Sequence, residues 1–373
     1  MVAAIEPDTA RAAAVAADYA IPVFPSVDEL LSADLKLDAA TVAVPTVHHH
    51  AVASPLLEAG IDLLVEKPLT ASLAEADDLI RIAETRRDEK GKLILQPGHL
   101  ERFNPAVLAI EPKLRRPMFF EAHRLSVFTP RSLDVDVVLD LMIHDLDIVL
   151  TFAHSPVREV RAVGLPILSP KVDIANVRVE FESGCVANFT ASRVSTERVR
   201  KLRFFEPRQY VSIDYARQDL LVICVESEAG ATPSGGLIAL LPPHVAAMLP
   251  PGIAAGIASG KIDLAKIDPA TIAQFAAMAK IDPAVIAQFI GSVDAKTPAD
   301  ANASLSFTKP EVAPGEPLRL EIESFLDSVR TRREPRVTAW QGREALALAL
   351  EIQAAMAAHA VRAGLEDFFA PGA

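Results

Sequence analysis

Short apolar runs alternate with amphipathic segments through the first hundred residues, and this alternation restricts the possible fold more than any other feature of the sequence. The apolar runs cover residues 2–5, 40–44, 61–65 and 93–96. Asp8 and Ser72 stand before two of the intervening segments, where their side chains can cap a helix. Buried strands separated by helices are typical of a parallel sheet with crossover connections. Residues 1–104 are therefore predicted to form an α/β domain.

After Pro105 the pattern changes to closely spaced β-rich segments. Seven of them lie at residues 119–128, 157–163, 174–181, 186–192, 200–205, 210–215 and 220–225. One helix at about 135–152 interrupts them, and two more helices are predicted at 318–330 and 341–360. Strands that follow one another this closely favour antiparallel pairing. Residues 105–373 are thus predicted to form an α+β domain with a mostly antiparallel open sheet.

Residues 231–303 are predicted to be an insertion into this second domain, because they are rich in Ala, Pro and Gly. A string that starts at Lys266 recurs at Lys280, and in each copy an aspartate precedes a proline. That dipeptide suits the start of a helix. We expect short amphipathic helices on flexible connectors in this segment.

Charge and cysteine content narrow the class of partner. The formal net charge is −12 at pH 7, which argues against nucleic acid and anionic membranes, since both select a basic surface. Cys185 and Cys224 are too few for a disulfide scaffold and lack zinc-site spacing, which fits a cytoplasmic protein. The apolar stretch at 237–258 contains two proline pairs and is not predicted to span a membrane.

Polar residues stand where three of the N-terminal apolar runs end. They are Glu6, then Pro45, Thr46 and His49, then Glu66, Lys67 and Pro68. Ligands of open parallel sheets bind beyond the carboxyl ends of the strands. An acidic residue in the position of Glu6 can accept hydrogen bonds from a ribose of a dinucleotide. It can equally be an ordinary acid of a β–α turn.

Lys67 lies directly after an apolar run and before a proline, so a stiff backbone holds it. If it points into the crevice, burial favours its neutral form and a neighbouring carboxylate opposes that change. Such an amine can donate to a substrate hydroxyl or help to move its proton. The alternative is a surface lysine paired with Glu66.

Asp140 and His144 lie four residues apart in a predicted helix and so share one face. The carboxylate can fix the orientation of the imidazole while the imidazole exchanges a proton near neutral pH. The alternative is a histidine that pairs with an acid only for packing. No third ligand stands at a spacing diagnostic of a metal site, so none is predicted.

A basic run covers residues 192–203 of this acidic protein. Its cations are Arg193, Arg198, Arg200, Lys201 and Arg203. Arginine can bind a phosphate or pyrophosphate with two hydrogen bonds. A solvated edge strand protected by charge would show the same composition.

Taken together, these residues resemble the Gfo/Idh/MocA family of nicotinamide-dependent sugar oxidoreductases. The matching strings are AVPTVHH at 43–49, VEKPLT at 65–70, GHLERFNPAV at 98–107 and DLMIHDLD around Asp140 and His144. The resemblance covers about residues 1–230 and 304–365. It implies an N-terminal Rossmann domain that binds NAD and a C-terminal α+β domain whose open sheet face forms homo-oligomers.

The resemblance also implies roles for the site residues. Lys67 would lie near the nicotinamide and the reacting hydroxyl, and His144 would be the general acid/base with Asp140 beside it. The cofactor would be lined by Glu6, Pro45, Thr46, His49, Glu66 and Pro68. The substrate would be reached by Arg102, Asn104, Arg193 and Arg200. Glu6 would favour NAD over NADP, because it would repel a 2′-phosphate.

Within the family, the strings at 98–107 and 192–205 look most similar to bacterial members that oxidise the C3 hydroxyl of UDP-N-acetylglucosamine, on the route to a diamino lipid A sugar. Oxidation of inositol or of a free sugar is an alternative reaction. A non-catalytic relative that binds a sugar nucleotide is an alternative of a different class.

The chain departs from the family at the dinucleotide fingerprint. The string G-x-G-x-x-G should open the first β–α turn, about 20 residues before the ribose acid. It occurs nowhere in the sequence, and with Glu6 as that acid it would precede Met1. We therefore expect the chain to start too late and to lack the first strand, the pyrophosphate loop and the first helix. Because that strand is central, its two neighbours are expected to have unpaired inner edges.

Overall fold

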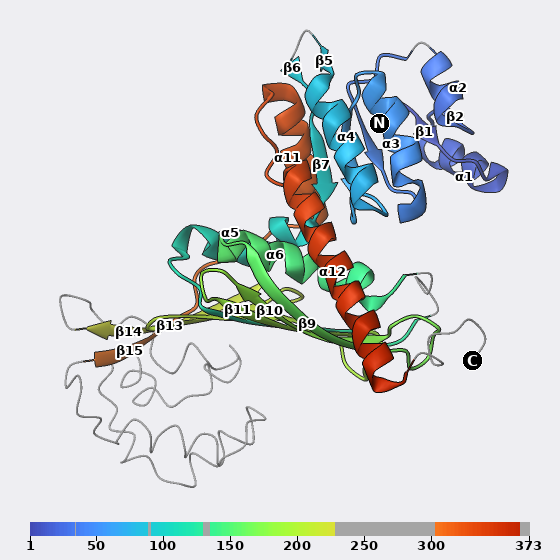
Figure 1. The fold of residues 1–373 in the computed structure, drawn as a ribbon. Helices are drawn as coiled ribbons and strands as arrows, with labels where there is room; N and C mark the ends of the chain where they lie inside the picture. Colours follow the sequence, from blue (N-terminus) through green and yellow to red (C-terminus); the bar gives the residue numbers. More distant parts are fainter. Residues whose placement is uncertain (34, 89–90, 130–134, 228–302, 366–373) are drawn as a thin grey trace.

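The computed structural model describes residues 1–33, 35–88, 91–129, 135–227 and 303–365. The predicted insertion at 231–303 therefore lies, apart from its last residue, outside the described residues. The described chain forms an α/β domain at the N-terminus and a domain built on one large sheet, with a long C-terminal helix running between them (Figure 1).

The N-terminal domain alternates short strands and helices. Its elements are β1 (Ala4–Ile5), α1 (Thr9–Tyr19), β2 (Val23–Phe24), α2 (Val27–Ser32), β3 (Ala39–Val42), α3 (His49–Glu58), β4 (Asp62–Glu66), α4 (Leu73–Thr85), β5 (Arg87–Asp88), β6 (Gly91–Lys92) and β7 (Leu95–Gly98). Asp8 caps α1 by accepting a hydrogen bond from the amide of Arg11, and Ser72 with Glu75 forms a capping box on α4. These are the caps that the sequence predicts.

The parallel strands of this domain form two separate sheets. One contains β1 and β2, and the other has the order β3-β4-β7. Within the described residues, β1 pairs only with β2 and β3 only with β4. One edge of β1 and one edge of β3 are therefore unpaired among the described residues. This agrees with the unpaired inner edges predicted from the sequence for these two strands.

The second domain is built on eight strands in the order β15-β14-β13-β12-β8-β11-β10-β9. Neighbours are antiparallel except β8 and β11, which are parallel. The strands are β8 (Phe119–Leu125), β9 (Val157–Leu165), β10 (Ile174–Phe181), β11 (Val186–Ser192), β12 (Val199–Glu206), β13 (Gln209–Asp214), β14 (Asp219–Ser227) and β15 (Ala303–Thr308). The prediction of a mostly antiparallel open sheet is confirmed.

Helices cover one face of this sheet, as Figure 1 shows with the sheet seen edge-on. They are the short α5 (Pro105–Ile110) and the longer α6 (Ile143–Ala153), which follows a π-helical turn, η4 (Val138–Met142). Phe204 packs against Phe120 and against Phe152 of α6, with ring centroids 5.7 and 6.0 Å apart. The sequence predicts one helix over this region but not its π-helical first turn.

Two C-terminal helices join the domains. Helix α11 (Pro317–Thr331) packs on the N-terminal sheet, where Phe325 and Val329 contact Leu64 of β4. Helix α12 (Ala339–Ala363) contacts α4 at one end and α6 and β9 further along. Its length and apolar composition would suit a membrane span, but Leu346, Leu348, Ala349, Ile352 and Met356 are buried in the core.

Candidate active site

The end of β4 carries Lys67 from the N-terminal sheet to the helices of the second domain. The Nζ atom donates a hydrogen bond to the backbone oxygen of Asp140 at 2.7 Å, and the carboxylate Oδ1 of Asp140 lies 3.9 Å away. Lys67 is joined to Pro68 by a cis peptide bond. The structure therefore brings together the lysine and the aspartate that the sequence singled out.

Asp140 lies in the π-helical turn η4, where the amide of Ile143 bonds to the oxygen of Val138, five residues earlier. Such turns space backbone carbonyls differently from an α-helix and are frequent at functional sites. Here the turn presents the Asp140 carbonyl to Lys67. His144 follows one turn later, at the start of α6.

The imidazole of His144 is half-buried, and its Nδ1 atom is buried without a hydrogen-bond partner among the described residues. Burial lowers the pKa of His144 well below its usual value, and the positive charges of Lys67 and Arg124 lower it further. The ring is therefore neutral near pH 7 and able to accept a proton.

Burial also lowers the pKa of Lys67, while the carboxylates of Asp140 and Glu66 oppose that change. A buried amine beside an acid is a common arrangement where protons are exchanged. The two groups that the sequence proposed for proton transfer thus both have lowered pKa values, and the charge of Lys67 contributes to the shift of His144.

A second histidine, His99, lies near these groups and is not among the site residues predicted from the sequence. His99 follows β7, is 1% exposed, and has no hydrogen-bond partner for either ring nitrogen in the part of the chain that the structure describes. Burial lowers its pKa, and Asp147, whose Oδ2 is 3.9 Å from Nδ1, opposes the shift. Its signal in the sequence was its place after the fourth apolar run.

A buried ion-pair network centres on Arg124 of β8, which is also not among the residues predicted from the sequence. Arg124 donates to both oxygens of Asp145, at 2.7 and 3.0 Å, and to Glu101 at 3.0 Å. Its guanidinium lies 5.2 Å from the centroid of the Tyr215 ring. Burial disfavours the charge of Arg124, but Asp145 outweighs it and the pKa of Arg124 is raised. The network fixes α6 to strand β8.

Three of the four residues predicted to reach a substrate are buried and bonded to protein groups. Asn104 donates to Glu101 at 3.2 Å and to the backbone of Tyr215 at 3.0 Å. Arg102 donates to Thr151 and lies 3.5 Å from Asp147. Arg193, 4% exposed, donates to backbone oxygens near the start of the η4 turn.

Arg200, the fourth, is exposed. It pairs in register with Arg124, so its side chain lies on the helix-covered face of the sheet, and its charge contributes to the low pKa of His144. The neighbouring Lys201 and Arg203 point to the opposite face, where Arg203 contacts Glu121 at 3.0 Å. The basic run of the sequence is therefore divided between two faces.

The residues predicted to line a cofactor lie at the carboxyl ends of β1, β3 and β4. Glu6 accepts a hydrogen bond from the amide of Asp8 at 2.8 Å. Pro45 and Thr46 begin a short 3-10 turn, η1 (Thr46–His48), after β3. His49 is buried, and its ring lies between the backbone oxygens of Val44 and Pro68, at 2.9 Å from each. It thus joins two strand-end loops.

Glu66 has its carboxylate beside Gly98 of β7. Its Oε2 atom lies 3.2 Å from the position a Cβ on Gly98 would take, and its backbone is closer still. Glu321 of α11 is 1% exposed, with Oε1 unbonded among the described residues. Burial raises the pKa of Glu321 to about 8, with a further contribution from Glu66.

The arrangement fits the nicotinamide end of a dinucleotide. The parallel strands β3 and β4 end at the same edge of their sheet, and β1 ends in its own sheet with β2. Neutral His144 has a buried Nδ1 atom without a hydrogen-bond partner among the described residues. The pyrophosphate end would need a glycine-rich loop, and the string G-x-G-x-x-G is absent from the sequence. Among the described residues, no group of three or more His, Cys, Asp or Glu side chains could hold a metal ion.

Two family models match the chain. Residues 1–91 match the oxidoreductase family with an NAD-binding Rossmann fold, and residues 108–208 match the GFO/IDH/MocA C-terminal domain. These matches confirm the family resemblance, the Rossmann-type fold and the class of cofactor predicted from the sequence motifs.

Known proteins agree with this result. A UDP-N-acetylglucosamine 3-dehydrogenase of Acidithiobacillus ferrooxidans is 42% identical over 56% of this chain and 65% of its own length. An inositol 2-dehydrogenase of Corynebacterium glutamicum is 30% identical over 45% of this chain and 49% of its own length. The matched region thus spans less than two thirds of these curated relatives.

Solved structures match over more of the chain. The UDP-N-acetylglucosamine 3-dehydrogenase of Acidithiobacillus ferrooxidans superposes with a TM-score of 0.70 at 30% identity, over 95% of this chain and 89% of that one. A levoglucosan dehydrogenase in complex with NADH gives a TM-score of 0.64 at 14% identity, over 95% and 87%. The second match shows the fold alone.

Proposed function

Because the chain belongs to the Gfo/Idh/MocA family of NAD-binding oxidoreductases, we propose that it transfers a hydride between a hydroxyl-bearing carbon of a sugar and NAD. The observation that carries the proposal is the bond from Lys67 to Asp140, with His144 one turn further on. These groups come from two domains and meet at the strand ends where a nicotinamide would lie. NAD supplies the hydride acceptor at C4 of its nicotinamide.

The protein groups move the proton. As the alcohol carbon loses a hydride and becomes a carbonyl, its hydroxyl proton must pass to a base. His144 has the low pKa of a neutral imidazole and takes that proton. Lys67 donates a hydrogen bond to the reacting oxygen, and Asp140 holds the amine in place. Glu6, Pro45, Thr46, His49, Glu66 and Pro68 are proposed for the cofactor side.

For the substrate we propose UDP-N-acetylglucosamine, oxidised at its C3 hydroxyl to a ketone. The support is the 42% identity to the dehydrogenase of that name and the exposed cation of Arg200 on the face that carries His144. A cation there suits a diphosphate. Arg102 and Asn104 act on this substrate through the helices that they hold, given their buried contacts.

Inositol is the second candidate substrate, favoured by the 30% identity to an inositol dehydrogenase. We further propose a cytoplasmic homo-oligomer that uses the sheet face opposite the helices. Phe119, Phe205 and Tyr210 form a stack of rings on that face, with centroid distances of 5.4 and 5.1 Å.

The test is a panel of UDP-sugars, inositol and free sugars incubated with NAD while NADH absorbance is followed. UDP-N-acetylglucosamine is expected to give the highest kcat/KM. His144→Ala is expected to lose turnover while NAD still binds in equilibrium dialysis. If the unmodified chain binds NAD in dialysis but oxidises no member of the panel, the proposed reaction is wrong. If it binds a UDP-sugar but no NAD, the non-catalytic alternative replaces it.

A further inference from the structure

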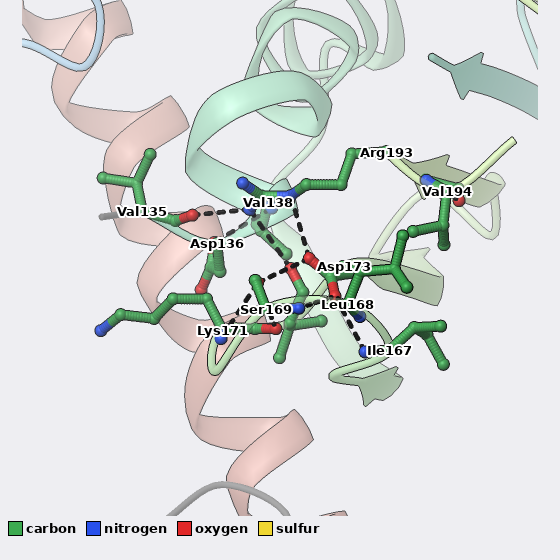
Figure 2. A network of polar contacts seen from close by, with 12 residues as sticks. Val135, Asp136, Val138, Ile167, Leu168, Ser169, Lys171, Asp173, Arg193 and Val194 are labelled. Carbon is green, nitrogen blue, oxygen red and sulfur yellow. Dashed lines mark hydrogen bonds and ion pairs between the residues drawn. The ribbon is translucent and has the colours of Figure 1, made fainter. Parts of the chain in front are cut away.

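The π-helical turn that carries Asp140 is fastened to the sheet at its start by a buried polar cluster (Figure 2). The cluster contains Asp173, which precedes β10, and Arg193, which follows β11. Both side chains are nearly inaccessible to solvent, at 0% and 4% exposed.

The carboxylate of Asp173 accepts most of its hydrogen bonds from residues of its own loop. Its Oδ2 atom accepts hydrogen bonds from the successive amides of Ile167, Leu168 and Ser169, at 2.8, 2.6 and 2.9 Å. Its Oδ1 atom accepts the Ser169 hydroxyl at 2.7 Å. Burial raises the pKa of Asp173, but these bonds outweigh it and the pKa is lowered. The hydrogen bonds within its loop therefore keep Asp173 ionised.

Arg193 makes its shortest bond elsewhere. Nη2 donates to the backbone oxygen of Val135 at 2.6 Å and lies 3.4 Å from that of Val172, while Nε is 3.4 Å from the Asp173 carboxylate. Figure 2 shows the guanidinium between Asp173 and Val135. The planar guanidinium of Arg193 thus links Asp173 and its loop to Val135, which precedes the π-helical turn.

Other bonds fix the same entry point. The amide of Val137 donates to the oxygen of Val172 at 3.0 Å. Asp136 caps the turn by accepting from the amides of Val138 and Leu139, both at 3.0 Å, and Gln353 of α12 donates to Asp136 at 2.5 Å. The position of the turn, and with it the Asp140 carbonyl, depends on this set of contacts.

We infer that Arg193 is a positioning residue that holds the η4 turn, and so Asp140 and His144, in register with Lys67. This inference rests on the proposed function and replaces direct substrate contact as the role of Arg193. Lysine at this position keeps the charge but lacks the planar guanidinium fork that reaches Val135 and Asp173 at the same time. A small displacement of a catalytic group lowers the rate of the chemical step more than it weakens binding.

The experiment compares Arg193→Lys with Arg161→Lys, an exposed arginine of β9 in the same sheet whose ion pair is with Glu159. Hydrogen exchange is measured on the amides of residues 137–140, and kcat and KM are measured with UDP-N-acetylglucosamine and NAD. For Arg193→Lys we expect faster exchange confined to that segment, a loss of about 10- to 100-fold in kcat, and little change in KM. The control should change none of these.

Unchanged exchange at 137–140 overturns the inference whatever the activity. A rise in KM with kcat preserved also overturns it, because that result assigns Arg193 to substrate binding. A failure of the proposed function is visible separately, in the absence of turnover by the unmodified chain, and the exchange measurement still decides whether the contact holds the turn.

Discussion

The amine of Lys67 bonds to the backbone oxygen of Asp140 rather than to its carboxylate. The Nζ···O distance is 2.7 Å, against 3.9 Å to Oδ1. A strand end of one domain is thus joined to the main chain of a helix in the other. Replacing the Asp140 side chain leaves this bond in place, whereas replacing Lys67 removes it. The two residues should therefore give different results when they are changed.

Lys67→Met is expected to lower kcat by roughly 10²–10⁴-fold, because it removes the amine that donates to the reacting oxygen. Folding should be retained, since a buried cation is replaced by an apolar chain of similar length. Steady-state kinetics and thermal unfolding check both points. Lys92→Met, an exposed lysine of the same domain, is the matched control. Equal kcat in the two variants would contradict a role for Lys67 in the reaction.

Asp140→Asn should keep the geometry and change the pH dependence. The Asp140 carboxylate raises the pKa of Lys67 against the effect of burial, so its removal lowers that pKa further. If Lys67 acts as the charged donor, the alkaline limb of kcat against pH moves to lower pH in this variant. Rate profiles from pH 6 to 10 test the shift, with Asp18→Asn, an exposed acid of α1, as the control. An alkaline limb at the same pH in both variants argues that the carboxylate does not act on the amine.

Most of the longer strands and the order of the site motifs could be predicted from the sequence, because strand-end residues such as Lys67 and Glu66 follow short buried runs. The strands β2 and β15 are not among those predicted from the sequence. The i, i+4 spacing of Asp140 and His144 placed them on one helix. The π-helical turn could not be predicted, because it depends on contacts from Val172 and Arg193 that are distant in sequence. Local composition likewise could not separate exposed Arg200 from buried Arg193, since that difference arises only when the sheet is covered.

Arg124 and Arg203 lie on neighbouring strands, and each pairs with a carboxylate, but only Arg124 is buried. Arg124→Met leaves Asp145 and Glu101 without their counter-charge and is expected to cost about 3–5 kcal/mol of unfolding free energy. Arg203→Met is expected to cost less than about 1 kcal/mol, because its pair with Glu121 is partly solvated. Denaturant titrations of both variants measure the difference. Comparable losses would mean that burial does not set the strength of these pairs.

Glu321 is expected to make the free energy of unfolding depend on pH, and this dependence can be measured without an activity assay. Its pKa is about 8 in the folded chain, against an ordinary value of 4.5, because burial and then Glu66 disfavour its charge. The folded state therefore holds this proton more tightly than the unfolded state. The contribution to stability is full below about pH 4.5 and is lost as the pH rises to about 8. Glu321→Gln removes this dependence and should raise the free energy of unfolding at pH 9 by roughly 1–3 kcal/mol, relieving a buried charge.

The matched variant for this test is Glu323→Gln, since Glu323 lies on the same helix but is exposed and paired with Arg319. Urea titrations at pH 5, 7 and 9 should show unfolding free energy falling with pH in the unmodified chain and in Glu323→Gln, and less steeply in Glu321→Gln. Parallel pH dependence in all three proteins would place the titrating group elsewhere. Because α11 packs on β4, a loss of stability at high pH should also destabilise β4, the strand that ends in Glu66 and leads into Lys67.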